Sequence, residues 1–161
     1  MNRTSWVTVV GAFAVAAMGS YAVFVLAQGM GAPTPPATWF THVFMAAVTA
    51  VVFFRGRAVR RLVEGEVTTM TPLEAARVAM LAKTSTVVGS LLAGYFAAVA
   101  VFVVGLPAAP ARLELLISAL VGIGMAALMV VVGILVEGWC RIDPPEDDLP
   151  GGREPSAPSA I

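Results

Sequence analysis

The stretch from Thr71 to Val104 constrains the fold more than any other part of the chain. It opens with the letters TPLE, in which a capping threonine, a proline at the first helical position and a glutamate near the positive end of the helix dipole mark the start of an α-helix. No proline follows within the stretch, so a single helix of about 50 Å is expected, whereas the hydrocarbon core of a bilayer is about 30 Å thick. The charged residues Glu74, Arg77 and Lys83 all lie near its beginning. The helix is therefore expected to begin in water and to enter the membrane near Lys83.

Three other apolar runs have the length of a membrane span. Together with the end of the long helix, they predict spans at residues 6–28, 37–54, 84–104 and 115–136. Hydrophobic residues make up 58% of the chain and charged residues 12%, against about 25% charged residues in soluble domains. These values exclude a soluble protein and predict an all-α integral membrane fold, a four-transmembrane-helix bundle in residues 1–141. Residues 142–161 are rich in proline, glycine and acidic residues, which predicts a disordered tail.

Turn-forming residues mark the boundaries between the spans. Gly29 to Pro36 and Gly105 to Arg112 are predicted as short turns, and Gly65 is predicted to end the basic segment after the second span. The first run is also compatible with a cleaved signal peptide, since Val25-Leu26-Ala27 resembles a small-residue cleavage site. The run exceeds the roughly 7–15 apolar residues of a signal core, so a retained helix is favoured.

Small side chains recur at every fourth position within the third span, in two neighbouring rows. The first row consists of Ser85, Gly89, Ala93 and Ala97, and the second consists of Thr86, Ser90, Gly94 and Ala98. Four-residue spacing places each row on one face of the helix, where small side chains let another backbone approach closely. We therefore predict helix packing at Ser85, Gly89, Ser90, Ala93 and Gly94. A face that lines a substrate path is the alternative.

Four arginines follow the second span directly, in the segment RGRAVRR. Arg55, Arg57, Arg60 and Arg61 are expected to contact anionic lipid headgroups and to set the topology of the chain. Nine of the ten basic residues fall on one side of the predicted bundle, and Arg112 alone falls on the other. The positive-inside rule then predicts a protein of the cell membrane with both termini in the cytoplasm. A nucleic-acid partner is not expected, because the cluster is short and has no interleaved aromatic residues.

A second group of charges is expected where the third and fourth spans reach the same boundary. Lys83 and Glu137 have similar predicted depths, Arg141 lies one turn beyond Glu137, and Arg77 lies further toward the cytosol. Such a group could bind an anionic ligand or lipid headgroup, or relay protons. The favoured interpretation is a structural ion pair, since charged residues at a membrane usually pair with one another.

His42 and Cys140 are the only histidine and the only cysteine. One cysteine cannot form an internal disulfide, and one histidine cannot build a histidine-based metal cluster, so no metal site or cofactor is predicted. For His42, a neutral ring bonded to a backbone carbonyl or a facing hydroxyl is favoured over a proton-linked or ligand-binding role. Cys140 could be an acylation site beside the membrane, but an inert thiol is favoured.

Two passages resemble a known family. TPLEAARVAMLAKTSTVVGSLLAGY and VEGWCRIDPPED are similar to segments of a family of small actinobacterial membrane proteins, the domain of unknown function 3180, and the similarity covers most of residues 1–148. The matching motif residues are Arg77, Lys83, Glu137, Trp139, Cys140 and Arg141. The family pattern has a basic residue where this chain has Gly138. Members are often encoded near folate-biosynthesis genes, so the resemblance implies a link to pterin or folate metabolism but no defined activity.

These observations lead to two hypotheses of function. The first is a non-enzymatic accessory subunit that binds a partner membrane protein, or a second copy of itself, through its small-residue faces. The second is a homo-oligomeric transporter or permease component for an anionic molecule, such as a pterin- or folate-related one, built around Lys83, Glu137 and Arg141. The first is favoured because no span carries an acidic residue at its midplane, the usual mark of proton coupling. A membrane enzyme is not expected, because His42 and Cys140 are predicted on opposite sides of the bilayer.

Overall fold

The computed structural model describes residues 5–31, 39–63, 72–106 and 110–140. It contains four α-helices: α1 (Trp6–Gly29), α2 (Trp39–Val63), α3 (Pro72–Val104) and α4 (Pro110–Trp139). Each helix is long and apolar enough to cross a membrane, and none of the described residues forms a strand. The predicted all-α fold with four membrane-spanning helices is therefore confirmed. The predicted tail at residues 142–161 lies outside the described residues.

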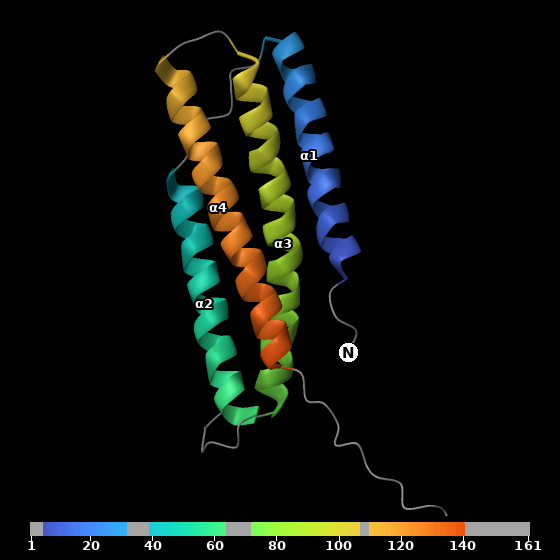
Figure 1. Ribbon diagram of the computed structural model, residues 1–161, viewed down its shortest axis with the longest axis vertical. Coiled ribbons are helices and arrows are strands. Elements are labelled where there is room, and N and C mark those ends of the chain that lie inside the picture. The colour runs from blue at the N-terminus through green and yellow to red at the C-terminus, as the bar shows by residue number, and fades with distance from the viewer. Residues whose placement is uncertain (1–4, 32–38, 64–71, 107–109, 141–161) are drawn as a thin grey trace, which may run out of the picture.

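α3 is the single long helix that the uninterrupted sequence predicts. It has 33 residues, begins at Pro72 and carries Glu74 in its first turn. At about 1.5 Å per residue, α3 is longer than the hydrocarbon core is thick. Its first turns accordingly extend past the beginning of α1 and the end of α4 (Figure 1). Thr71, the predicted capping residue, lies outside the described residues.

α4 begins earlier than the sequence predicts. The predicted turn extended to Arg112, but the helix starts at Pro110, because proline has the backbone angle of a first helical residue and needs no hydrogen-bond donor there. Arg112 and Glu114 are therefore helical. Arg112 Nη2 donates a hydrogen bond of 2.9 Å to the backbone oxygen of Val104. This bond satisfies a carbonyl group at the end of α3 and ties the beginning of α4 to that end.

The helices run alternately in opposite directions, so α1 and α3 are parallel and α2 and α4 oppose them (Figure 1). α3 packs against α1 on one side and against α4 and α2 on the other. α2 also packs against α4, whereas α1 contacts no described helix except α3. We define the basic end as the end of the bundle where α2 and α4 end and α3 begins. The basic side chains described there are Arg55, Arg57, Arg60, Arg61, Arg77 and Lys83.

Three clusters of buried side chains lie between the helices, two of them between α2, α3 and α4 and the third between α3 and α4. The cluster at the basic end consists of Val52, Val59, Val78, Ala82, Val132 and Val136. The middle cluster consists of Met45, Phe96 and Ala126. The third cluster consists of Val99, Val103 and Ala119, and Phe24 of α1 packs against it. α1 contributes no buried residue, so the interior belongs to the other three helices.

Candidate functional site

One glycine from each small-residue row of α3 faces a different neighbouring helix. Gly89 faces α4, because a Cβ atom added there would lie 3.0 Å from Val130 Cγ2 and 3.2 Å from the backbone oxygen of Ala126. Gly94 faces α1, because an added Cβ atom would lie 2.9 Å from the Cβ atom of Ala16. The lack of a side chain at these glycines lets α3 approach both neighbours at van der Waals distance.

The polar members of the rows are buried and bond mainly within α3. Thr86 Oγ1 donates to the backbone oxygen of Ala82 over 3.1 Å, and Ser90 Oγ donates to that of Thr86 over 2.8 Å. The buried hydroxyl of Ser85 has no hydrogen-bond partner among the described residues. Ala93 is half-buried and packs against the middle cluster. The rows thus contact helices of the same chain.

The predicted charge cluster is not joined by contacts between Lys83 and Glu137. Lys83 is exposed, and within the described part of the chain no ion pair or hydrogen bond links it to Glu137. Lys83 precedes Gly94 by about three helical turns, so it lies on the face of α3 that packs against α1 further along. Arg77 is exposed on the first turns of α3, and Arg141 lies outside the described residues.

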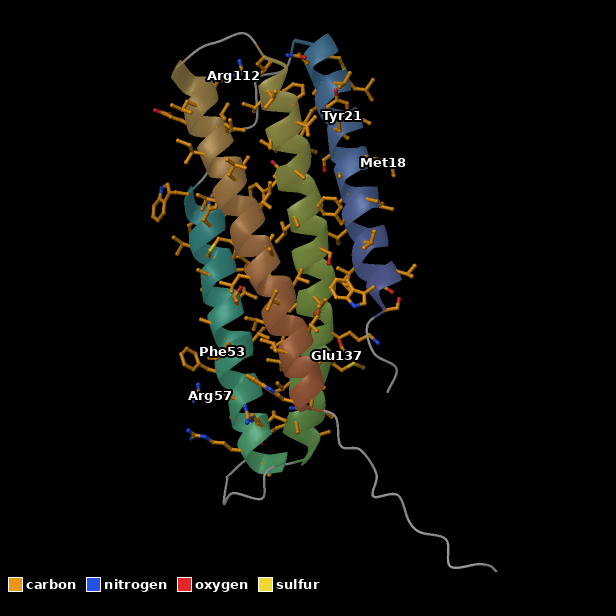
Figure 2. All side chains as sticks on the ribbon, in the orientation of Figure 1. Met18, Tyr21, Phe53, Arg57, Arg112 and Glu137 are labelled. Carbon is orange, nitrogen blue, oxygen red and sulfur yellow. The ribbon has the colours of Figure 1, made fainter. Side chains whose placement is uncertain are left out.

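Glu137 lies at the basic end of α4, half-buried beside α3 (Figure 2). It follows Gly133 by about one turn. A Cβ atom added at Gly133 would meet Thr86 Oγ1 and lie 3.0 Å from the backbone oxygen of Ala82. Glu137 is therefore on the side of α4 that packs closely against α3, which accounts for its partial burial.

Trp139 of α4 connects the arginine cluster of α2 to the bundle. Its ring centroid lies 6.1 Å from that of Phe53, and the guanidinium carbon of Arg60 lies 5.5 Å from the Trp139 ring centroid. Phe53 and Arg60 are about two turns apart on one face of α2, so a single indole of α4 contacts both. The contact of Arg60 with the ring is a cation–π interaction, which holds the guanidinium at the surface of the bundle. The sequence carries no signal for this pairing beyond an aromatic residue near the end of a span.

The remaining arginines of α2 are exposed at the basic end. Figure 2 shows Arg57 on the outer side of α2. Arg60 and Arg61 stand in the last turn of the helix, where positive charge interacts favourably with the negative end of the helix dipole. The helix therefore continues through the whole cluster and presents it as a rigid surface.

His42 links α2 to α4. Its Nε2 atom lies 3.0 Å from the backbone oxygen of Ser118, and its ring lies 5.6 Å from the ring of Phe96. A carbonyl oxygen only accepts, so His42 Nε2 carries the hydrogen of this bond. The expected bond of His42 to a backbone carbonyl is confirmed.

Cys140 follows the end of α4 and is half-buried. Burial raises the pKa of its thiol, which lowers the fraction of reactive thiolate near neutral pH. This environment supports the interpretation of an inert thiol. In the described ranges, no three histidine, cysteine, aspartate or glutamate side chains lie close enough to hold a metal ion.

Comparison with known proteins gives one match. The model of the family described as "Protein of unknown function (DUF3180)" matches residues 9–144, which include the first of the two passages that resemble this family and most of the second. No curated protein and no solved structure matches the chain. The matched region extends from the first turn of α1 to beyond the end of α4. The chain therefore belongs to the DUF3180 family.

Proposed function

We propose that the protein is a non-enzymatic, multi-pass protein of the plasma membrane that acts by binding a partner membrane protein through α1. The observation that supports this proposal most strongly is the place of α1 at the edge of the bundle. α1 contacts only α3 among the described helices, and none of its residues is buried. A membrane-spanning helix held on one side has most of its circumference available to a helix of another protein.

The outward side of α1 has the small residues that close helix packing requires. Among the described residues, no atom of another helix lies within 4 Å of a Cβ atom added at Gly11 or Gly19, whereas Ala16 contacts Gly94 of α3. Between helices in lipid there is no hydrophobic driving force, so association depends on close approach, which glycine permits. The small-residue rows of α3 already contact α4 and α1, whereas Gly11 and Gly19 of α1 are open.

The charge distribution supports an orientation with the basic end in the cytoplasm. Six described basic residues lie at that end, and Arg112 lies at the opposite end. Lysine and arginine favour the cytoplasmic side of membrane proteins. In this orientation α1 begins, and α4 ends, toward the cytoplasm.

Bulky substitutions at the open glycines of α1 test the proposal. Gly11→Leu and Gly19→Leu should leave the thermal unfolding midpoint of the purified protein unchanged, because the space at both positions is open. They should sharply reduce the amount of a defined partner that co-purifies from native membranes in mild detergent, as measured by quantitative mass spectrometry. Gly124→Leu is the matched control, because Gly124 is equally open but lies on α4.

The proposal requires that the control variant retain the partner and that the α1 variants lose it. Retention of the partner by both α1 variants would contradict docking on α1. Recovery of a second copy of the chain alone would identify a homo-oligomer and would contradict a distinct partner.

The alternative of a transporter for an anionic molecule requires Lys83, Glu137 and Arg141 to act as one site. No contact between described residues joins Lys83 to Glu137, so no observation here favours this function. The same purification also tests it. A bare homo-oligomer that retains a pterin-like or other anionic small molecule would replace the partner-binding proposal.

A further inference from the structure

The end of α2 concentrates positive charge at the level where its apolar stretch ends. Phe54 is 69% exposed and closes the apolar stretch. Four exposed arginines follow it within two turns: Arg55, Arg57, Arg60 and Arg61. The described acidic residues at this end are only Glu74 and Glu137, against six basic ones. Among the described residues of the basic end, positive charge therefore predominates.

Trp139 positions one of these guanidinium groups. The ring of Trp139 packs beside Phe53 and lies under Arg60, with 5.5 Å between the guanidinium carbon and the ring centroid. Indole rings are enriched at membrane–water interfaces, where the ring contacts the apolar layer and its N–H reaches the polar one. Arg60 is thus held beside an aromatic surface at the end of the apolar stretch of α2.

Arg57 lies beside Arg60 on the same side of α2. It is one turn beyond Phe53 and one turn before Arg60, so the helix places it between the two residues that contact Trp139. Arg57 is exposed and has no hydrogen bond or ion pair to another residue in the described part of the chain. Arg60 therefore stands beside the indole where α2 and α4 meet, and Arg57 stands one turn before it on the outer side of α2 (Figure 2).

We propose that Arg57 and Arg60, together with Trp139, bind the phosphate headgroup of an anionic phospholipid. The planar guanidinium group donates two parallel hydrogen bonds to phosphate oxygens, and two such groups side by side match the oxygens of one phosphodiester. This site is separate from the proposed partner surface on α1 and does not depend on it.

The surroundings of the site select a lipid over a soluble phosphate. The arginines follow the exposed Phe54 without a break in the helix, so the charged surface is continuous with the apolar outer surface of α2. The acyl chains of a bound lipid would lie along this apolar surface while the headgroup contacts Arg57 and Arg60. A soluble phosphate would gain only the polar half of these contacts.

Lipid binding by arginine variants of the full-length protein tests the proposal. The purified protein is titrated with phosphatidylglycerol in detergent, and bound lipid is counted by native mass spectrometry, with phosphatidylcholine as the neutral reference. Each basic residue near an anionic surface contributes enough to change affinity by about fivefold, so R57Q/R60Q should weaken phosphatidylglycerol binding by about thirtyfold. Trp139→Leu keeps both charges but removes the ring that packs against Arg60, and it should weaken binding by about threefold.

Arg55→Gln is the matched control. It removes one charge, as Arg57→Gln alone does, from the same helix at nearly the same depth, but Arg55 lies five residues before Arg60 and therefore on a different face of α2. Arg57→Gln alone should weaken binding by about fivefold, and Arg55→Gln, which lies outside the proposed contact, should weaken it by less. The unfolding midpoint of each variant in phosphatidylcholine shows whether it folds, and R57K/R60K, which keeps the charge, provides a milder second variant that should bind better than R57Q/R60Q.

Three outcomes would overturn the proposal. If R55Q weakens binding as much as R57Q alone, the lipid responds only to total charge. If R57Q/R60Q binds phosphatidylglycerol like the unmodified protein, these arginines do not contact it. If inorganic phosphate raises the unfolding midpoint as strongly as phosphatidylglycerol does at equal concentration, the site binds a soluble anion.

Discussion

At the scale of single residues, three of the four buried hydroxyl groups in the described ranges bond within their own helix, and that of Ser85 does not. The hydroxyls of Thr49, Thr86 and Ser90 donate to backbone oxygens one turn earlier, and Thr49 Oγ1 lies 2.8 Å from its acceptor in Met45. In hydrocarbon no water is present to accept these bonds, so a bond within the same helix is the available solution. His42 differs, because its bond to Ser118 crosses from α2 to α4. It is therefore a polar link between helices as well as a satisfied group.

Cys140 allows a prediction about pH. Burial disfavours the thiolate and raises the pKa of Cys140, so the pH of half-maximal alkylation should be higher in the folded protein than in the chain unfolded by denaturant. Limited access lowers the maximal rate but does not move this midpoint, so a full pH profile of alkylation by a small maleimide separates the two effects. A midpoint at or below that of the unfolded chain would contradict the burial argument and restore a reactive role for Cys140.

At the scale of helices, close approach depends on a few glycines that face a neighbouring backbone. Gly89 and Gly133 bring α3 and α4 together, and Gly94 brings α3 to α1. Gly122 adds a fourth contact, because a Cβ atom there would lie 2.6 Å from Cγ of Phe96. The packing is therefore set by interlocking surfaces, in which a missing side chain on one helix receives a side chain or backbone of the next.

Gly133→Ala tests this packing. The new methyl group would meet Thr86 Oγ1 and the backbone of α3, so α3 and α4 must separate locally, at a cost of about 1–3 kcal/mol in the free energy of unfolding. The thermal unfolding midpoint in detergent should fall accordingly. Gly124→Ala is the control on the same helix, because its Cβ atom enters open space, and it should be neutral or slightly stabilising. Equal midpoints for the two variants would show that the α3–α4 contact is looser than the structure indicates.

At the scale of the whole molecule, the two ends of the bundle differ in charge. The basic end carries six described cations, whereas the described cation at the opposite end, Arg112, bonds to the end of α3. A bundle with this asymmetry inserts in one direction, because basic residues are retained on the cytoplasmic side. The proposed lipid site and the proposed orientation therefore depend on the same charges.

Cysteine labelling in intact cells tests the orientation. In a Cys140→Ser background, Met30→Cys at the end of α1 should react with a membrane-impermeant maleimide added outside, because the end opposite the basic end is expected to face outward. Arg61→Cys at the exposed basic end should react only after permeabilisation. Labelling of Arg61→Cys but not Met30→Cys in intact cells would reverse the orientation.

Much of the fold follows from the sequence alone. Four apolar runs of spanning length predict four helices, because hydrocarbon offers backbone groups no partners outside their own helix. The proline-free stretch after Pro72 predicts the 33-residue length of α3, and the structure confirms it. The beginning of α4 was placed too late, since Pro110 was interpreted as part of a turn although proline is also a favourable first helical residue.

The contacts between residues of different helices are decided only by the packing of the bundle. Four-residue spacing of small side chains identifies a face that any backbone can approach, so the sequence does not distinguish α4 as the neighbour of Gly89 from α1 as the neighbour of Gly94. Similar depth likewise suggested a pair of Lys83 with Glu137, but depth leaves the rotation of each helix about its axis open. The contact of Trp139 with Arg60 likewise depends on the rotation of α2 and α4 about their axes, which the sequence does not give. Length and hydrophobicity are properties of one segment, whereas a contact depends on the rotation, crossing and order of two segments, which only their mutual packing sets.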